Sequence, residues 1–207
     1  MFFSEEELSS LKEKVKLRMS DKRFSHTLGV ERCAGKLGNL VLPDRVSELR
    51  AAAILHDISK EMPIASQFDI ICENSFELTD EDRETTGVIH SFSAPYVVKR
   101  DFHEFATDDV LSAVFNHTLA CENMSTFDKI IFVADYVEDT RIYSSCVRVR
   151  ELLFNGIETL DSTGRLKRLD EAFLAAINGA LEALERMGQP INSRIYKAKK
   201  YLEMNKL

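Results

Sequence analysis

Apolar residues recur at three- and four-residue intervals along most of the chain, which is the periodicity of helices that bury one face. Alternating apolar and polar runs between turn dipeptides, which would predict strands, are missing. A first helix is predicted to begin at Ser4, because this serine is followed by three glutamates. The pattern predicts further helices at about 24–40, 43–55, 63–74, 91–102, 108–117, 126–138, 145–155, 168–187 and 193–203. The sequence therefore predicts an all-α fold.

The length and composition are typical of one globular domain. The chain has 207 residues, of which 44% are hydrophobic and 29% are charged, so it is long enough to bury a core without disulfide support. The net charge of −7 argues against binding to nucleic acid polymers or to anionic membranes. A small anion stays a candidate ligand if positive charge is concentrated in one pocket, and a bound metal ion supplies such charge.

The cysteines and the N-terminus indicate the compartment. The four cysteines lie far apart in the sequence, at Cys33, Cys72, Cys121 and Cys146. Without a C-x-x-C pair they are predicted to be reduced, mostly buried thiols. The acidic start of the chain differs from the basic start of a signal peptide, and apolar stretches such as 130–134 are too short to span a bilayer. We expect a cytoplasmic protein.

Four of the five histidines lie in or beside apolar helical segments. His103 is surrounded by charged residues and is predicted to lie on the surface. The other four are His26, His56, His90 and His117. Each is separated from the next by about the length of one helical hairpin, so an antiparallel bundle would return all four rings to a similar depth.

Two aspartates accompany these histidines. Asp135 follows the apolar run 130–134, where a carboxylate is costly to bury unless it is paired, for example with Arg141, or bound to a metal. His56 and Asp57 are adjacent and would point about 100° apart on a regular helix, so both serve one centre only at a helix end. Each residue alone has an ordinary structural explanation. Together they predict a metal site, and imidazole with carboxylate ligands favours iron, manganese or zinc.

The order of these residues resembles that of a known superfamily. The pattern H…HD…D, formed by His26, the His56-Asp57 pair and Asp135, resembles the HD superfamily of metal-dependent phosphohydrolases. Local detail is similar to the YqeK-type branch of that superfamily. The similar segments are 23–30, 54–60, 115–118, 128–138 and 188–191.

The resemblance implies a fold and an activity. The fold would be a single helical HD domain over residues 1–207, with the motifs in a core at about 18–142 and C-terminal helices at about 145–205 packed on it. The activity of the branch is the symmetrical hydrolysis of diadenosine tetraphosphate to two ADP, with iron and a metal-activated water. The substrate partner would be a small nucleotide, and pairing with a second copy of the chain through an outer face is left open.

The resemblance also assigns roles to individual residues. The metal ligands would be His26, His56, Asp57 and Asp135. The catalytic residues would be Asp57, Lys60, His90 and His117. The substrate would be contacted by Arg23, Asp57, Ile58, Ser59, Lys60, His90, His117, Thr118, Asp135, Arg141, Asn178 and Ala183. One metal ion is expected rather than two, iron before manganese or zinc, although His90 and His117 are alternative ligands for a second ion, as in two-metal relatives.

The cationic side chains also have simpler explanations. Arg23 has the geometry for bidentate contact with a phosphate, but it is also within reach of acidic residues in the first helix. Lys60 would act as a point charge on a phosphate, or else as a solvated cation at a helix end.

Three segments depart from the pattern of the branch. Residues 119–120 are Leu-Ala where Thr-Gly is expected, and they would line the substrate pocket. Residues 139–141 are Asp-Thr-Arg, which keeps only the arginine of the expected Pro-Asn-Arg. Asn192 replaces the usual histidine. The alternatives are therefore an HD phosphohydrolase for another nucleotide or phosphate ester, an iron-dependent HD oxygenase with two metals, and a non-catalytic nucleotide-binding HD domain.

Overall fold

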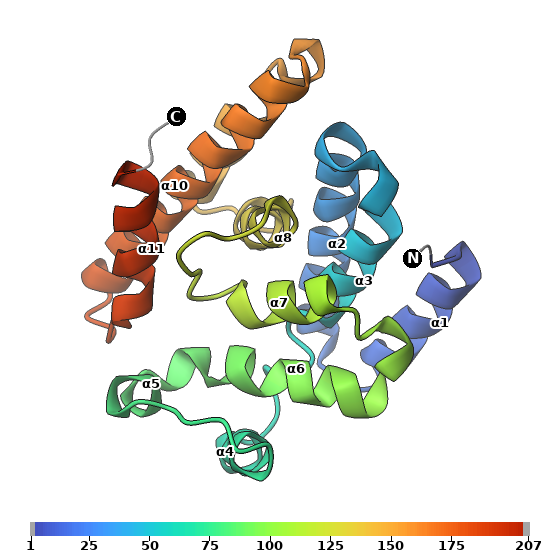
Figure 1. The fold of residues 1–207 in the computed structure, drawn as a ribbon, viewed down its shortest axis with the longest axis vertical. Coiled ribbons are helices and arrows are strands. Elements are labelled where there is room, and N and C mark those ends of the chain that lie inside the picture. Colours follow the sequence, from blue (N-terminus) through green and yellow to red (C-terminus); the bar gives the residue numbers. More distant parts are fainter. Residues whose placement is uncertain (1–2, 205–207) are drawn as a thin grey trace.

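The computed structural model describes residues 3–204, and every regular element within this range is helical (Figure 1). The α-helices are α1 (Glu5–Lys16), α2 (Asp21–Val41), α3 (Val46–Leu55), α4 (Ile64–Glu73), α5 (Asp80–Glu84), α6 (Ile89–Asp101), α7 (Asp108–Asn116), α8 (Thr126–Val137), α9 (Ser144–Phe154), α10 (Ser162–Arg186) and α11 (Ser193–Met204). Short 3-10 turns precede α3, α6, α7 and α10. The predicted all-α class is confirmed. The ends of the predicted domain, residues 1–2 and 205–207, lie outside the described part.

Side-chain caps explain where several helices begin. Ser4 caps α1 in a reciprocal capping box with Glu7, as predicted. α2 and α10 begin earlier than predicted, because Ser20 accepts a hydrogen bond from the backbone of Arg23 and Asp161 accepts one from that of Gly164. The short helix α5 was not predicted, since its five residues are too few to show a helical period.

The central helices carry the core of the molecule. α2 packs against α3 and α8, and α7 packs against both α3 and α8. α6 covers α7 and also contacts α4, below the central group in the view of Figure 1. α10 packs against α8, α9 and α2 on the other side, so the C-terminal helices contact the helices that carry the predicted motifs. This arrangement brings the ends of α3, α7 and α8 toward the N-terminal half of α2.

The cysteines differ in part from the prediction. All four are free, but only Cys146 is buried, while Cys33 and Cys121 are partly buried and Cys72 is exposed. The expectation of mostly buried thiols is therefore wrong. Cys72, for example, lies on the solvent-exposed face of the amphipathic helix α4. His103 is exposed over 83% of its side chain, as predicted. Within residues 3–204, no helix combines the length and the apolar character needed to cross a membrane.

Candidate metal centre

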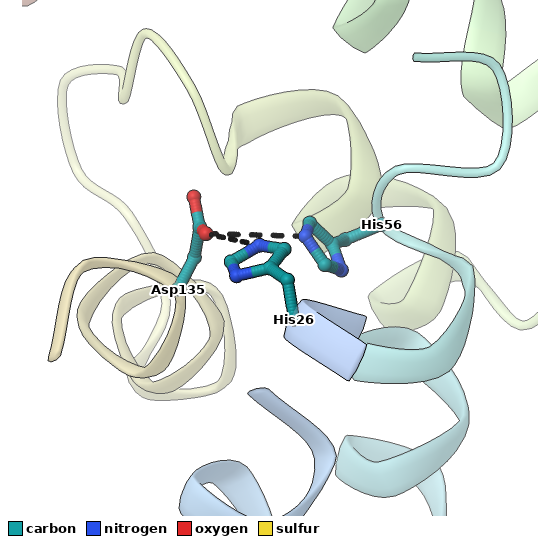
Figure 2. Close-up of side chains that lie close together, drawn as sticks. All are labelled: His26, His56 and Asp135. Carbon is teal, nitrogen blue, oxygen red and sulfur yellow. Dashed lines mark ion pairs between the residues drawn. The ribbon is translucent and has the colours of Figure 1, made fainter. Parts of the chain in front are cut away.

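Three helices bring His26, His56 and Asp135 together (Figure 2). His26 lies near the start of α2, His56 directly follows α3, and Asp135 lies in the last turn of α8. The Nε2 atom of His26 is 3.0 Å from Oδ1 of Asp135, and Nε2 of His56 is 3.9 Å from the same oxygen. One potential ligand atom from each residue therefore faces a common point. Because His56 is at the helix end, the adjacent Asp57 also faces this region.

A second group of potential ligands shares the carboxylate of Asp57. Its Oδ2 atom is 3.3 Å from Nε2 of His56 and 3.8 Å from Nε2 of His26. Its Oδ1 atom is 3.3 Å from Nε2 of His90, on α6, and 3.6 Å from Nε2 of His117, at the end of α7. The two latter ring nitrogens are 3.1 Å apart. The four histidines predicted to converge therefore do so, with Asp57 between two pairs.

The donor set and its unmet hydrogen bonds fit a divalent metal ion. The Nε2 atoms of His26 and His56 are buried and have no hydrogen-bond partner. The Nδ1 atoms of His56 and His117 lie 2.7 Å from the carbonyls of Ala53 and Val114, respectively. If each Nδ1 carries the proton, each Nε2 presents a lone pair to the cluster. Buried imidazole lone pairs facing carboxylates form a site that a cation stabilises.

The electrostatic environment keeps the carboxylates ionised. Burial alone would raise the pKa of Asp57, but the charge of His56 and hydrogen bonds with the histidines hold it well below its usual range. Burial is likewise outweighed at Asp135, whose pKa is held low by the charge of Arg141 and by the nearby ring of His26. At His26, burial lowers the pKa, but the adjacent carboxylates of Asp135 and Glu138 raise it to about 9. A metal ion that binds His26 would therefore displace a proton.

Three cations surround these ligands. Nη1 of Arg23 is 2.8 Å from Oδ2 of Asp57, and Nη2 of Arg141 is 2.9 Å from Oδ1 of Asp135. Nζ of Lys60 donates to the carbonyl of Gly87 at 3.0 Å and is 3.2 Å from Nδ1 of His90. Burial lowers the pKa of Lys60. The simpler explanations therefore do not apply, because Arg23 pairs with the aspartate of the HD pair rather than with the first helix, and Lys60 is not a fully solvated cation.

The arginines lie closer to solvent than the carboxylates that they contact. The side chains of Arg23 and Arg141 are 27% and 36% exposed, against 5% and 20% for those of Asp57 and Asp135. Thr118 also faces the cluster, with Oγ1 3.2 Å from Nε2 of His90. The outer edge of the cluster is therefore cationic and polar, which suits the approach of an anion.

Other predicted substrate contacts lie elsewhere. Ile58 is 2% exposed in the main apolar core. Ser59 is fully buried and its hydroxyl is occupied, because it donates to the carbonyl of His90 at 2.9 Å and accepts from Ser93. Both side chains are occupied by contacts within the protein, and contact of Ile58 and Ser59 with a substrate stays a prediction.

The predicted contacts in the C-terminal helices are less direct. Asn178 borders a cavity of about 260 Å³ between α9 and α10, whose lining includes Ser145 and Gly179 but none of the clustered histidines or aspartates. Its buried Oδ1 atom has no hydrogen-bond partner. Ala183 lies further along α10 and is partly buried. Their contact with substrate stays a prediction.

The departures from the branch pattern have structural explanations. Leu119 is 6% exposed and packs in a second apolar cluster with Ile71 and Phe92. Ala120 is buried and adopts a φ of +57°, the conformation that glycine tolerates best. Their place beside the substrate pocket stays a prediction. Asn192 is buried, and its side-chain amide donates a hydrogen bond to the carboxylate of Asp82 at 2.8 Å.

Two residues near the cluster were not assigned a role from the sequence. Glu138 is 1% exposed and its Oε1 lies 3.1 Å from Nδ1 of His26. Glu138 directly follows the last residue of α8 and is no longer helical, so helical spacing from Asp135 does not predict this contact. Arg150 donates to the carbonyls of Val137, Glu138 and Arg141, which no sequence pattern indicates.

The helical fold and the two groups of histidines and aspartates fit a metal-dependent helical domain. The HD domain family model matches residues 23–140, more than half of the chain, so the chain belongs to the HD domain family. The matched range contains every residue of the two ligand groups. A divalent metal requirement follows from the family and from these ligand groups.

Curated relatives and a solved structure agree with this placement. The chain is 28% identical over 179 residues to the symmetrical bis(5'-nucleosyl)-tetraphosphatase of Bacillus subtilis, covering 86% of this chain and 87% of the relative. It is 29% identical to the protein of the same name from Halalkalibacterium halodurans, with the same coverage. A predicted HD superfamily hydrolase involved in NAD metabolism, from Clostridium acetobutylicum, aligns over 100% of both chains with a TM-score of 0.83 and 24% identity. At that identity the structural match shows the fold.

Proposed function

We propose that this chain hydrolyses diadenosine tetraphosphate symmetrically to two ADP, using divalent iron. The observation that carries the proposal is the pair of ligand groups joined by Asp57 and edged by cations at Arg23, Lys60 and Arg141. The names of the two curated relatives support the substrate, since each alignment covers most of both chains. Small nucleotide anions also suit an acidic protein whose positive charge is concentrated at one site.

The two ligand groups allow the site to hold one or two ions. We propose that His26, His56, Asp57 and Asp135 hold the first ion, as expected from the sequence. His90 and His117, with the other oxygen of Asp57, form a group able to hold a second ion. A metal count near one per chain would leave these two histidines free for proton transfer, and a count near two would make them ligands. Iron is proposed before manganese and zinc, all of which accept this ligand set.

When bound, a divalent ion lowers the pKa of a water molecule and polarises a phosphoryl oxygen. The protein residues do the rest. Arg23 and Arg141 each have five N–H donors, of which the carboxylates of Asp57 and Asp135 and the backbone carbonyl of Asp135 use only part, so the remaining donors can bind phosphate oxygens. Lys60 adds a point charge, and Thr118 adds a hydroxyl. A proton for the leaving phosphate can be held by Lys60, His90 or His117, whose side chains lie next to one another.

The test is a product analysis on protein purified with its native metal. Metal per chain is counted by elemental analysis, and the products from diadenosine tetraphosphate are separated by anion-exchange chromatography. An Asp57→Ala variant controls for contaminating activity. ADP as the only product, absent with the variant, is the expected result. AMP with ATP, or no turnover, would contradict the proposal and point to an HD phosphohydrolase for another phosphate ester.

Two further predictions from the sequence accompany this proposal. We propose a cytoplasmic location, and pairing of two copies is tested by light scattering of the purified protein.

Oxygen consumption with two irons per chain would support the oxygenase alternative. Tight nucleotide binding without turnover of any phosphate ester would support a non-catalytic nucleotide-binding domain.

A further inference from the structure

Glu138 is a buried carboxylate that contacts the metal-ligand candidate His26 on the side away from the ligand cluster. Its side chain is 0% exposed, and its Oε1 lies 3.1 Å from Nδ1 of His26. The opposite ring nitrogen, Nε2, faces Asp135 at 3.0 Å. The ring of His26 is therefore held between the cluster on one edge and Glu138 on the other.

We propose that Glu138 is a positioning residue that fixes the ring orientation and tautomer of His26 for metal binding. The inference rests on the proposed metal site. A proton on Nδ1 donated to Glu138 leaves the lone pair of Nε2 directed at the cluster, and a carboxylate partner makes that lone pair more basic than a neutral partner would.

His26 differs from His56 and His117 in the origin of the partner of its Nδ1 atom. His56 and His117 each place Nδ1 2.7 Å from the carbonyl three residues earlier, so their own helices orient them. For His26 the partner is Glu138, the residue directly after α8, which is 112 positions away in the sequence and carries a full negative charge when ionised. Orientation of this ligand therefore depends on how the residues at the end of α8 are held.

The carboxylate of Glu138 is itself held in place. It accepts hydrogen bonds from the backbone N–H and from the hydroxyl of Thr140. Arg150 donates hydrogen bonds to the backbone carbonyls of Val137, Glu138 and Arg141. Thr140 is one of the positions that departs from the branch pattern, and here it supplies a hydroxyl that binds the carboxylate.

Gly29 provides the space that the carboxylate occupies. It lies three residues after His26 on α2, and a Cβ atom at this position would be 2.2 Å from Oε2 of Glu138. Because Thr140 and Arg150 restrict movement on the α8 side, even one methyl group would displace the carboxylate from His26. The glycine, rather than any larger residue, therefore allows α2 and α8 to approach at this ligand.

The experiment measures manganese binding by metal-free protein, with free Mn²⁺ counted by electron paramagnetic resonance. We expect Glu138→Ala to weaken the Kd by about 10- to 100-fold, and Glu138→Gln to weaken it less, because the carboxamide oxygen still accepts a hydrogen bond. Glu77→Ala, at an exposed glutamate between α4 and α5, is the matched control and should bind as the wild type does. Circular dichroism and the Tm establish that each variant is folded.

Gly29→Ala tests the same contact without removing the carboxylate. We expect it to weaken the Kd at least about tenfold in the wild-type background and less than about twofold in the Glu138→Ala background, since the two changes disrupt one interaction. If Glu138→Ala fails to fold, Glu138→Gln and Gly29→Ala carry the test. Wild-type affinity for manganese in folded variants at position 138 would overturn the role proposed for Glu138 and leave the proposed function unaffected. Absence of metal binding by the wild type would overturn the proposed function as well.

Discussion

Asp82 joins the last helix to the middle of the chain through a buried carboxylate. It lies in α5, is 1% exposed, and accepts hydrogen bonds from Asn192 at 2.8 Å and from Arg194 at 3.1 and 3.2 Å. The backbone N–H of Thr79 donates to it as well, at 3.0 Å. Burial alone would raise the pKa of Asp82, but the bonds from Arg194, Asn192 and Thr79 outweigh burial and lower it to about 2.

This pKa converts into a pH-dependent contribution to stability. A fall from the ordinary value of 3.8 to about 2 corresponds to about 2.5 kcal/mol of unfolding free energy, at about 1.36 kcal/mol per unit. Because the folded pKa lies below the unfolded one, the contribution is complete above about pH 4. It is lost as the pH falls through about 2, where both states bind the proton.

The assay compares the wild type with Asp82→Asn by urea unfolding at several pH values between 6 and 2.5. We expect the variant to be about 2 kcal/mol less stable at pH 6 and the difference to shrink steadily below pH 4. Asp80→Asn, an exposed neighbour in the same helix, is the control and should lie within about 0.5 kcal/mol of the wild type. A difference below about 0.5 kcal/mol at pH 6, or one that does not change with pH, would refute the reasoning.

Three further predictions concern other parts of the molecule. Ala120→Gly should leave the unfolding free energy unchanged or raise it by up to about 1 kcal/mol, because φ is +57° at this position and the strain of the alanine offsets the added flexibility and the lost methyl. Cys72 should be the first thiol alkylated at pH 8, while Cys33, whose pKa is raised to about 12 by burial, stays unmodified. Gly179→Ala should destabilise the protein by about 1 to 3 kcal/mol, because its Cβ would lie 2.1 Å from the hydroxyl oxygen of Tyr136.

Each of these has a contrasting measurement. Ala113→Gly, in the regular helix α7, should cost about 1 kcal/mol or more, and an equal cost at position 120 would contradict the strain argument. Peptide mass spectrometry after brief alkylation locates the modified thiol, and Cys33 reacting as fast as Cys72 would contradict the second prediction. A Tm for Gly179→Ala equal to that of the wild type would show that Tyr136 moves aside freely.

Local sequence signals were sufficient for the helices and for the candidate metal ligands. Helix periods and caps such as Ser4 act within a few residues, so they can be recognised in one segment at a time. The ligand residues were recognisable for a different reason, because buried histidines and aspartates are chemically costly in apolar segments and their order matches the HD pattern. The boundaries of α2 and α10 were less predictable, since the capping residue determines them more than the apolar period does.

The distances between helices were beyond the reach of local patterns. The sharing of Asp57 between two ligand pairs depends on how α2, α3, α6 and α7 meet, which is set by packing of side chains far apart in the chain. The same holds for the burial of Ser59, because its side chain is polar and only its neighbours in space bury it. The contact of Glu138 with His26 across 112 positions illustrates the general reason. Helix patterns report which face of each helix is buried, whereas the partner of a buried polar atom is chosen by the packing of the whole fold.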